Sequence, residues 1–562
     1  MFCGQQKPGR AAALSLALAA ALASALWPHP ARAQGERESL EAVRQTTLAL
    51  IELLVQNGTL PRDKADALLA EAKKRADAAV AAAAEAAKAE PPVVRVPYVP
   101  QVVRDQIRNE VREEVLARAK LERWGVPNAT AEWTDHISIE GDLRVRAQSD
   151  RLGSNNPSPQ DFLAASLGGT TRAADFAAGT STGLPTGSTQ DERDRMRLRA
   201  RLGINAKISD SVTAGIRLAT GSASDRVSTN QTLGQNFNRY QFLVDRAFVK
   251  LDPVEWVSVS AGRFANPWFS TDLVWSDNLN FDGVTATVKR PPEPTATWLP
   301  YATVGYFPLR EKTGLRGGRA MTGAQVGVQW EKSETTRVKF GAAQYSYSNF
   351  EGRIDPDYDP VFGPGRKYGQ YEYEAGLRQR GNTLFLTNNS QELALGLTPD
   401  KALWGLASRF RPMAFTAAAE FSHFAPFFIG LSGEVVHNNA FDKQEILART
   451  GIQLDDARTW GAGIRATLGA QQVRNQGDWQ VSLGYRWLGS DAVPDAFVDS
   501  DLGLGGTNVR GVTAGVLYGV SRDTQMGLRV LSGRTISSPT VHPGAKDHYS
   551  VFSLQVDLNV RF

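Results

Sequence analysis

The clearest pattern in the sequence is a strict alternation of apolar and polar residues close to its C-terminus, between Tyr549 and Phe562. From Phe552 onward every second residue is apolar, and the residues between them are Ser553, Gln555, Asp557, Asn559 and Arg561. Because successive side chains of a strand point to opposite faces, this segment predicts a β-strand with one apolar and one polar face. An ordinary amphipathic edge strand of a soluble sheet would show the same alternation.

The same period of two starts at Trp133 and continues through the rest of the chain. An antiparallel up-and-down β-barrel of about sixteen transmembrane strands fits this all-β pattern, and sixteen lies in the even-numbered range of such barrels. The expected strands lie near 137–148, 195–208, 212–218, 239–252, 256–265, 283–291, 297–308, 320–331, 335–349, 411–424, 427–438, 457–470, 478–489, 508–520, 524–534 and 547–562.

The expected connections alternate in length along the chain. Short turns at one end and long loops at the other are typical of outer-membrane barrels, and an even strand count brings both ends of the barrel to the short-turn side. The short connections include 252–255, 331–334, 425–426 and 521–524, and the long ones include 150–190, 266–282, 350–405, 438–456 and 489–507.

Composition agrees with a barrel better than with membrane-spanning helices. Charged residues make up 22% of the chain, its mean hydropathy is −0.30 and its formal net charge is only +4. Only helices and closed barrels satisfy every backbone polar group in hydrocarbon, and we find no segment after residue 33 that is apolar enough for a spanning helix. A membrane location therefore requires a barrel, which we place at 131–562.

The first 33 residues are typical of a secretory signal peptide. Lys7 and Arg10 precede the apolar run 11–27, and Ala31-Arg32-Ala33 is a small-x-small cleavage site. An N-terminal membrane anchor is the alternative, but the run is rich in alanine and short. The single cysteine, Cys3, lies in the segment that would be removed, so we expect neither disulfides nor thiolate metal sites.

Residues 34–127 have a helical pattern instead. Leu40, Val43, Leu50 and Leu54 recur at spacings typical of a coiled-coil seam. A Pro-rich stretch at 91–100 would form an extended spacer. We expect a helical, coiled-coil region in the periplasm, although solvated helices packed on one another would give the same pattern.

Arginines dominate the polar face of the strand expected at 195–208. A barrel of about sixteen strands leaves an aqueous channel, so this face should line it. Charged ladders set the ion preference of pores, which predicts a preference for anions. The alternative is that these arginines pair with Glu140, Asp142, Asp191 and Asp194. The predicted pore-lining basic ladder consists of Arg144, Arg146, Arg193, Arg195, Arg197, Arg199, Arg201 and Arg217.

The long loop 266–282 is the candidate for a constriction of the channel. It is apolar enough to fold against another part of the protein, and it carries Asp272, Asp277 and Asp282. Acidic residues on a loop that bends into the lumen would face the basic wall and create a transverse field. An extracellular loop packed on its neighbours is the alternative.

Enzymatic motifs are missing from the sequence. None of the six histidines lies in a G-x-S-x-G or H-E-x-x-H motif. We also find no phosphate-cradling loop and no nucleic-acid patch. We therefore expect no catalytic residues, no metal, no cofactor and no nucleic-acid partner.

Taken in order, several segments resemble the putative porin family of proteobacteria. They are residues 48–72, 137–148, 195–222, 245–253, 261–269 and the terminal LQVDLNVRF. The resemblance implies an outer-membrane porin that allows passive diffusion of small solutes and ions, as a homotrimer in outer-membrane lipid. It also implies that the barrel-assembly machinery reads the terminal strand ending in Phe562.

Three other functions stay open at this point. A channel of similar build could be specific for one solute, such as phosphate or a carboxylate. A mainly structural barrel could anchor the helical region to the cell wall or to a partner. A barrel enzyme that acts on lipid is the third.

Overall fold

A computed structural model describes residues 136–562 except 159–168, 173–188, 191, 292–295, 314–316, 334, 355–369, 388–402, 425 and 539–547. Before residue 136 it describes only Ala67, Ala70, Lys74 and Val111. The predicted signal peptide and, apart from these four residues, the predicted helical region 34–127 lie outside the described residues. The chain divides into two units, Met1–Glu113 and Glu114–Phe562, and the strands and helices below belong to the second. No helix among the described residues is long and apolar enough to cross a membrane.

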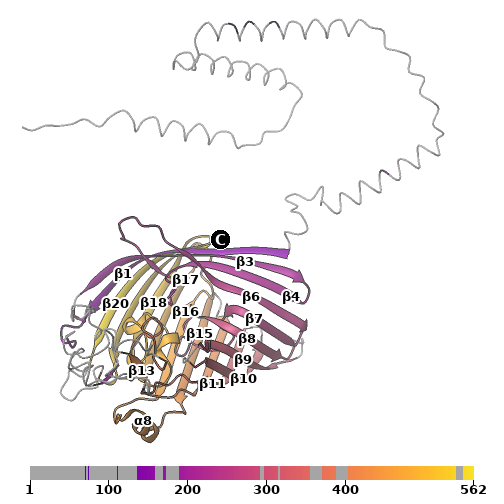
Figure 1. Cartoon of the computed structure of the whole chain (residues 1–562). Coiled ribbons are helices and arrows are strands. Elements are labelled where there is room, and N and C mark those ends of the chain that lie inside the picture. The colour runs from indigo at the N-terminus through magenta and orange to yellow at the C-terminus, as the bar shows by residue number, and fades with distance from the viewer. Residues whose placement is uncertain are drawn as a thin grey trace, which may run out of the picture. The chain divides into compact units, whose positions relative to one another are not determined.

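Sixteen long strands form the wall of one antiparallel barrel in the part of the chain that the structure describes (Figure 1). They are β1 (Ile137–Leu152), β3 (Arg193–Ser209), β4 (Val212–Thr220), β6 (Phe242–Val254), β7 (Val257–Ala265), β8 (Asn280–Lys289), β9 (Trp298–Arg310), β10 (Arg319–Ser333), β11 (Thr336–Ser348), β14 (Pro412–Phe424), β15 (Phe427–Asn438), β16 (Trp460–Gly469), β17 (Trp479–Leu488), β18 (Val509–Ser521), β19 (Thr524–Thr535) and β20 (Ser550–Arg561). Each lies within a few residues of a strand that the alternation predicts, so the barrel prediction is confirmed.

The first and last strands close the barrel. β1 pairs with both β3 and β20, in a register that places Asp142 opposite Arg561. At the end of this seam the backbone N–H groups of Gly141 and Phe562 each donate to the carbonyl of the other, at 2.9 and 3.1 Å. The closed ladder leaves no exposed sheet edge, as a barrel in hydrocarbon requires.

Side chains of alternate parity face opposite sides of the wall. In β20, Phe552 is 44% exposed and Leu554 37%, whereas Ser553 and Gln555 are buried inside the barrel. The same holds around the barrel, where outward residues such as Val326, Phe415 and Ile464 are apolar and exposed. An apolar outer belt and a polar interior are the arrangement that lipid outside and water inside require.

Connections between the strands alternate in length, as predicted. Short turns such as 210–211 and 522–523 lie at one end, and long loops such as 349–411 and 489–508 lie at the other. The long loops contain elements that the sequence pattern does not predict, because they are too short to show a period. These are the two-residue β5 (Gln231–Thr232) beside β3, the small sheet of β2 (Thr170–Thr171), β12 (Leu384–Leu386) and β13 (Trp404–Leu406), the helix α8 (Lys443–Thr450), and the 3₁₀ turns η2 (Asp495–Phe497) and η3 (Leu502–Leu504).

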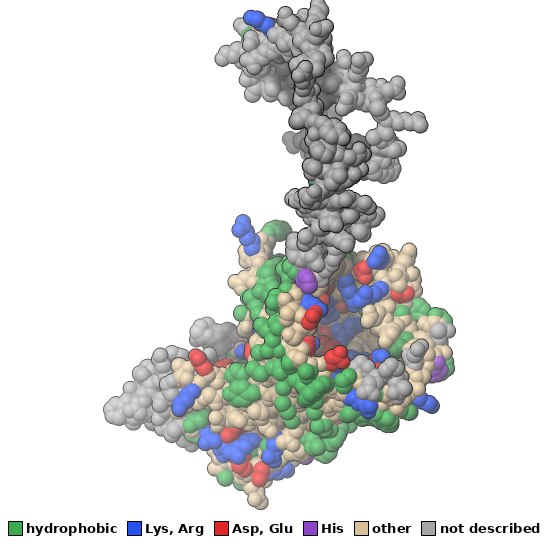
Figure 2. All heavy atoms as spheres, turned by 90° about the vertical axis from the view of Figure 1, so that its right-hand side faces the viewer, with side chains coloured by type: hydrophobic (Ala, Val, Ile, Leu, Met, Phe, Trp, Pro, Cys, Tyr) green, Lys and Arg blue, Asp and Glu red, His purple; other side chains and the backbone are tan. Residues whose placement is uncertain are grey.

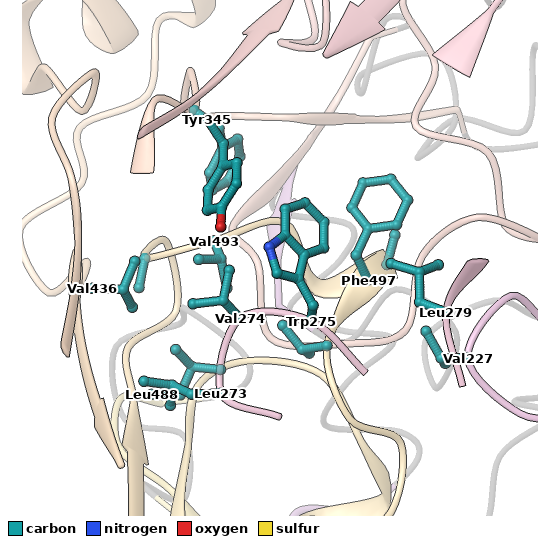
Figure 3. Close-up of a cluster of buried hydrophobic side chains, with 14 of the residues drawn as sticks. Val227, Leu273, Val274, Trp275, Leu279, Tyr345, Val436, Leu488, Val493 and Phe497 are labelled. Atoms are coloured by element: carbon teal, nitrogen blue, oxygen red, sulfur yellow. The ribbon is translucent and has the colours of Figure 1, made fainter. Parts of the chain in front are cut away.

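A cluster of buried apolar side chains lies inside the barrel and joins strands to loops. Trp275, from the connection between β7 and β8, packs edge-on against Tyr345 of β11, with ring centroids 5.0 Å apart. Phe497, from the connection between β17 and β18, lies against the other side of Trp275 at 6.0 Å (Figure 3). The loops therefore fold into the lumen and are held there by hydrophobic burial.

Candidate pore and its constriction

The connection 266–279 folds into the lumen and is fixed to the barrel wall at three places. The Thr271 N–H and hydroxyl both donate to Glu434 of β15, at 3.1 and 2.7 Å. The Phe269 N–H donates to the side-chain oxygen of Gln325, whose amide donates back to the Phe269 carbonyl, each at 2.8 Å. Asp272 forms the third contact. These contacts hold the segment against the inner side of the wall, and its role as a constriction stays a prediction.

Asp272 forms ion pairs with two arginines that the sequence analysis did not single out. Its carboxylate lies 2.6 Å from Arg465 of β16 and 3.0 Å from Arg486 of β17. Burial alone would raise the pKa of Asp272, but the two guanidinium groups lower it below its usual value. Asp272 therefore stays charged and anchors the loop to β16 and β17.

Asp277 lies on the same loop but in a different electrostatic environment. Burial raises its pKa, and the nearby charge of Asp272 adds to the effect. It lines a lumen cavity of ≈ 820 Å³ together with Arg144 and Arg199. Of the three predicted loop carboxylates, Asp272 and Asp277 both line this cavity, and Asp282 does not.

The prediction for Asp282 as a loop residue is wrong. Asp282 lies in β8, directly opposite Arg263 of β7, and accepts two hydrogen bonds from that guanidinium at 3.0 and 2.8 Å. The reason is that β8 begins at Asn280, three residues earlier than the alternation suggests. Asn280 and Phe281 do not extend a simple polar–apolar alternation, because Phe281 packs inward against Trp275 at 5.0 Å.

A second loop reaches the lumen, and the sequence analysis missed it. Residues 489–508 follow β17 and are almost all buried. Asp499 pairs with Arg486 at 3.3 Å, and Asp501 pairs with Arg529 of β19 at 2.7 Å. Its sequence could have identified it, because this long connection mixes apolar residues with four aspartates. Loop 266–282 shows a similar mixture.

The two carboxylates of this second loop have opposite pKa shifts. Burial raises the pKa of Asp499 and outweighs Arg486, which lowers it, while the neighbouring charge of Asp501 adds to the rise. For Asp501 burial acts in the same direction, but Arg529 and Arg146 outweigh it and lower the pKa. The second loop thus places one firmly charged and one easily protonated carboxylate at the lumen.

Most arginines of the predicted ladder are neutralised by aspartates. Arg146 holds Asp557 of β20 with two hydrogen bonds, at 2.6 and 2.9 Å. The remaining ion pairs follow the same wall: Arg195 with Asp150 at 2.8 Å, Arg199 and Arg201 with Asp142 at 2.7 and 2.5 Å, and Arg217 with Asp245 at 2.5 Å. Of the alternative partners, Asp142 is used, Asp194 pairs with Arg151 at 3.4 Å and Asp191 lies outside the described residues.

Two ladder arginines are bonded to neutral amides. Arg144 donates to the Asn230 side chain, and Arg197 donates to Gln148 at 3.3 Å. Within the described residues neither forms an ion pair with a carboxylate, and their Nε–H groups are buried with no hydrogen-bond partner. Arg193 lies exposed at the start of β3. Because Asp142 is shared by two guanidinium groups, this wall retains more positive than negative charge.

A second lumen cavity, of ≈ 460 Å³, lies at the seam where β1 meets β20. Arg201, Arg217 and Arg561 line it, together with Asp142 and Phe562. Figure 2 faces the end of the barrel at the right of Figure 1 and shows Lys and Arg side chains gathered in a hollow there. The basic surface therefore extends from the constriction toward the short-turn end of the barrel.

Metal chemistry finds no site in the described part of the chain. No group of three or more His, Cys, Asp or Glu side chains there is arranged to hold a metal ion. The charged side chains that line the lumen cavity are arginines and carboxylates, most of them in ion pairs, together with Arg144, which bonds to an amide. This arrangement can guide ions through a water-filled passage.

Known proteins were compared with the chain. None of the curated proteins compared matches it. Among solved structures, the loop L8 deletion mutant of OmpT from Vibrio cholerae is 10% identical, with a TM-score of 0.37, and covers 76% of this chain and 100% of its own. The outer membrane channel DcaP of Acinetobacter baumannii is 10% identical, with a TM-score of 0.38, and covers 77% and 100%. OprB of Pseudomonas putida is 10% identical, with a TM-score of 0.40, and covers 76% and 95%.

The profile of one protein family matches most of the sequence. This family is described as Putative porin, and the match extends over residues 44–562. It includes all sixteen barrel strands and both loops that enter the lumen. The chain therefore belongs to the Putative porin family, as an outer-membrane β-barrel porin and not an enzyme.

Proposed function

We propose that this porin allows passive diffusion of small hydrophilic solutes and ions and that it prefers anions. The proposal assigns the preference to the arginines of β1, β3 and β4, past which solutes would move. The constriction would be formed by loops 266–279 and 489–508. The main support for the proposal is the register of β1 and β3, which places arginines opposite arginines.

Like charges lie directly opposite one another on these two strands. Arg144 is opposite Arg199, and Arg146 is opposite Arg197. Such pairs of like charges are destabilising in a sheet. A structural role would be served better by a carboxylate or a neutral residue at one position of each pair. Positive charge retained at a water-filled lumen lowers the barrier for anions and raises it for cations.

The carboxylates of the constriction reduce this positive potential only in part. Asp272 is paired with Arg465 and Arg486, and Asp501 is paired with Arg529 and lies 3.6 Å from Arg146. Burial raises the pKa of Asp277 and Asp499, so these two are protonated more easily than ordinary aspartates. The surplus of Arg144 and Arg197 therefore has no matching surplus of negative charge.

Single-channel recording of the refolded mature chain in a planar bilayer, under a salt gradient, tests the proposal. Stepwise currents with a reversal potential that favours anions are the expected result. Stepwise currents with cation preference would leave the porin and overturn the role of the arginines. A verified folded barrel without conductance would overturn passive diffusion itself.

A channel specific for a carboxylate is the second candidate. A recess with an aromatic floor and arginines at its rim favours an organic carboxylate, because phosphate would make no use of the aromatic floor. A specific channel would show a saturable block of the ion current by its solute. A general porin would show a current that changes in proportion to the concentration.

The predicted partners follow from the family resemblance and stay proposals. We expect a homotrimer, which crosslinking in native membranes would detect. We also expect the assembly machinery to read Phe562, whose backbone completes the seam with Gly141. Deleting Phe562 should lower the amount of assembled barrel in cells more than the yield of refolding in detergent. Cleavage after residue 33 and a periplasmic location of residues 34–127 remain predictions as well.

A further inference from the structure

We propose that the recess lined by the loop residues Trp275, Phe350, Leu377 and Phe497 binds a small aromatic carboxylate. The proposal rests on the proposed function in one respect, since the ligand would be a solute on its way through the channel. The recess has a volume of ≈ 350 Å³ and shares no lining residue with the lumen cavity of ≈ 820 Å³. It is therefore a separate space and not an extension of the arginine wall.

Different residues of loop 266–279 line the recess and the lumen cavity. Trp275 and Leu279 line the recess, whereas Ser276, Asp277 and Asn278 line the lumen cavity. The loop residues between them thus separate the two spaces. A solute that arrives from the long-loop end would meet the recess before the constriction.

Aromatic side chains form the floor of the recess. Phe281 and Phe307 pack edge to face with ring centroids 5.2 Å apart, and Trp275 packs on Phe281 at 5.0 Å. Phe350 and Phe497 continue this surface at 6.3 Å from one another. Aromatic pairs prefer such tilted and offset contacts, so a further ring can join the cluster with the same geometry. The rigid floor needs little rearrangement to receive a ring, which favours binding.

The rim of the recess carries more positive than negative charge. Arg263 is neutralised by Asp282 at 2.8 Å. Glu374 is shared by Arg310 at 3.3 Å and Arg319 at 3.9 Å, so one carboxylate faces two guanidinium groups. Arg226 is bonded to the backbone carbonyls of Ser224 and Gly376, which are neutral. Among the described residues that line the recess are four arginines and two carboxylates, and Arg226 is the arginine whose printed partners are neutral.

This combination selects one class of ligand. Pockets that bind small molecules are mostly apolar, with a few charged or polar groups that fix orientation, and measure about 300–1,000 Å³. Planar guanidinium groups bind two oxygens of a carboxylate or a phosphate at once, and the aromatic floor favours a carboxylate that is joined to an apolar ring. A benzoate-sized molecule would place its ring on the aromatic floor and its carboxylate at the arginine rim. Acetate would lack the first contact and benzyl alcohol the second.

Equilibrium binding to the folded full-length protein tests the proposal without relying on conductance. Isothermal titration with benzoate should show saturable binding, and acetate and benzyl alcohol should each bind about tenfold more weakly or worse. Equal binding of acetate would overturn the role of the aromatic floor. Equal binding of benzyl alcohol would overturn the role of the arginines.

Two variants locate the site. Arg226→Gln removes one rim charge and should weaken benzoate binding about twofold to fivefold. Arg353→Gln is the control and should leave benzoate binding unchanged, because Arg353 pairs with Glu351 and does not line the recess. Leu377→Trp should fill the recess and abolish binding, whereas Leu447→Trp on the exposed face of α8 should not. Benzoate binding that survives Leu377→Trp in a protein of unchanged stability would overturn the proposal.

The reversal potential of the same preparation separates this inference from the proposed function. Anion-preferring currents without benzoate binding overturn the recess alone. Benzoate binding that the Leu377→Trp variant removes, in a protein without conductance, supports the recess and overturns passive diffusion. Block of the current by benzoate, but not by acetate, supports both.

Discussion

The inward side chains on two walls of the barrel differ in character. The wall of β1, β3, β4 and β20 faces the lumen with arginines and aspartates in ion pairs, together with Arg144 and Arg197, which bond to amides. The wall of β7 to β11 faces the lumen with Phe264, Phe281, Phe307, Met321 and Tyr345, which loops cover. The first wall therefore faces the lumen with charged side chains. The second wall packs against the loops that fold into the lumen.

The comparison shows that the side chains of a barrel strand that point inward need not be polar. They are polar where the strand meets water and apolar where a loop removes that water. On both walls the outward parity is apolar, because lipid covers it everywhere. The two walls can therefore be disturbed separately, and the following predictions use this.

The largest effect on stability is expected from a change in the apolar cluster between loop 266–279 and the wall of β7 to β11. Trp275 is 2% exposed and contacts Tyr345, Phe281 and Phe497. Trp275→Ala should lower the free energy of unfolding by about 3–5 kcal/mol, because it leaves a cavity under the loop. Denaturant unfolding of the refolded barrel measures this. Trp256→Ala, at a position that is 50% exposed, is the matched control and should change stability little. Equal losses in both variants would mean that the loop does not depend on this apolar cluster.

A smaller effect is expected when one anchor of loop 266–279 is removed. Glu434 accepts hydrogen bonds from Thr271 and from Thr416, so Glu434→Ala leaves buried donors unsatisfied. The expected loss is about 1–3 kcal/mol, with a rise in single-channel conductance as the loop moves away from the wall. Thr416→Val removes only the bond within the wall and is the control. Unchanged conductance in Glu434→Ala would show that the apolar cluster alone holds the loop.

Acidification should change ion preference more gently. The pKa values of Asp277 and Asp499 are raised, chiefly by burial, and that of Asp272 is lowered by its arginines. As the pH falls from neutral toward 3.8, the ordinary value for aspartate, Asp277 and Asp499 become neutral while Asp272 stays charged. Anion preference should therefore increase over this range.

The same shifts predict the direction of the change in stability. The raised pKa values mean that the fold favours the protonated forms of Asp277 and Asp499, so their contribution is full below the ordinary value and is lost as the pH rises through the raised values. Asp277→Asn should increase anion preference at neutral pH and flatten its dependence on pH. A steeper dependence in that variant would contradict the assignment.

The strands could be predicted from the sequence because their signal is local. Each side chain of β3 or β20 faces lipid or the lumen according to its own position, so the alternation alone defines the strand. The start of β8 could not be predicted in this way, because Phe281 faces inward onto a loop that is defined only in the folded protein. The loop 489–508 was missed for the same reason.

The arginines could be found from the sequence, but their partners could not. Five arginines at every second position of 193–201 predict a basic face without further information. Asp557, the partner of Arg146, is separated from it by 411 residues. Asp501 belongs to a loop whose composition could have indicated burial but not which arginine it would pair with. Which arginines keep their charge unpaired is thus a property of the closed barrel.

The reversal potential of an Arg144→Gln/Arg197→Gln double variant, compared with the wild type under the same salt gradient, tests the central claim most directly. Glutamine keeps the ability to donate to Asn230 and Gln148 but removes both unpaired charges from the wall. Arg522→Gln, whose side chain is 90% exposed at a short turn, is the matched control. The proposed role of the arginines predicts that the double variant loses most of its anion preference, while the control and the conductance stay close to the wild type. Undiminished anion preference in the double variant would contradict it.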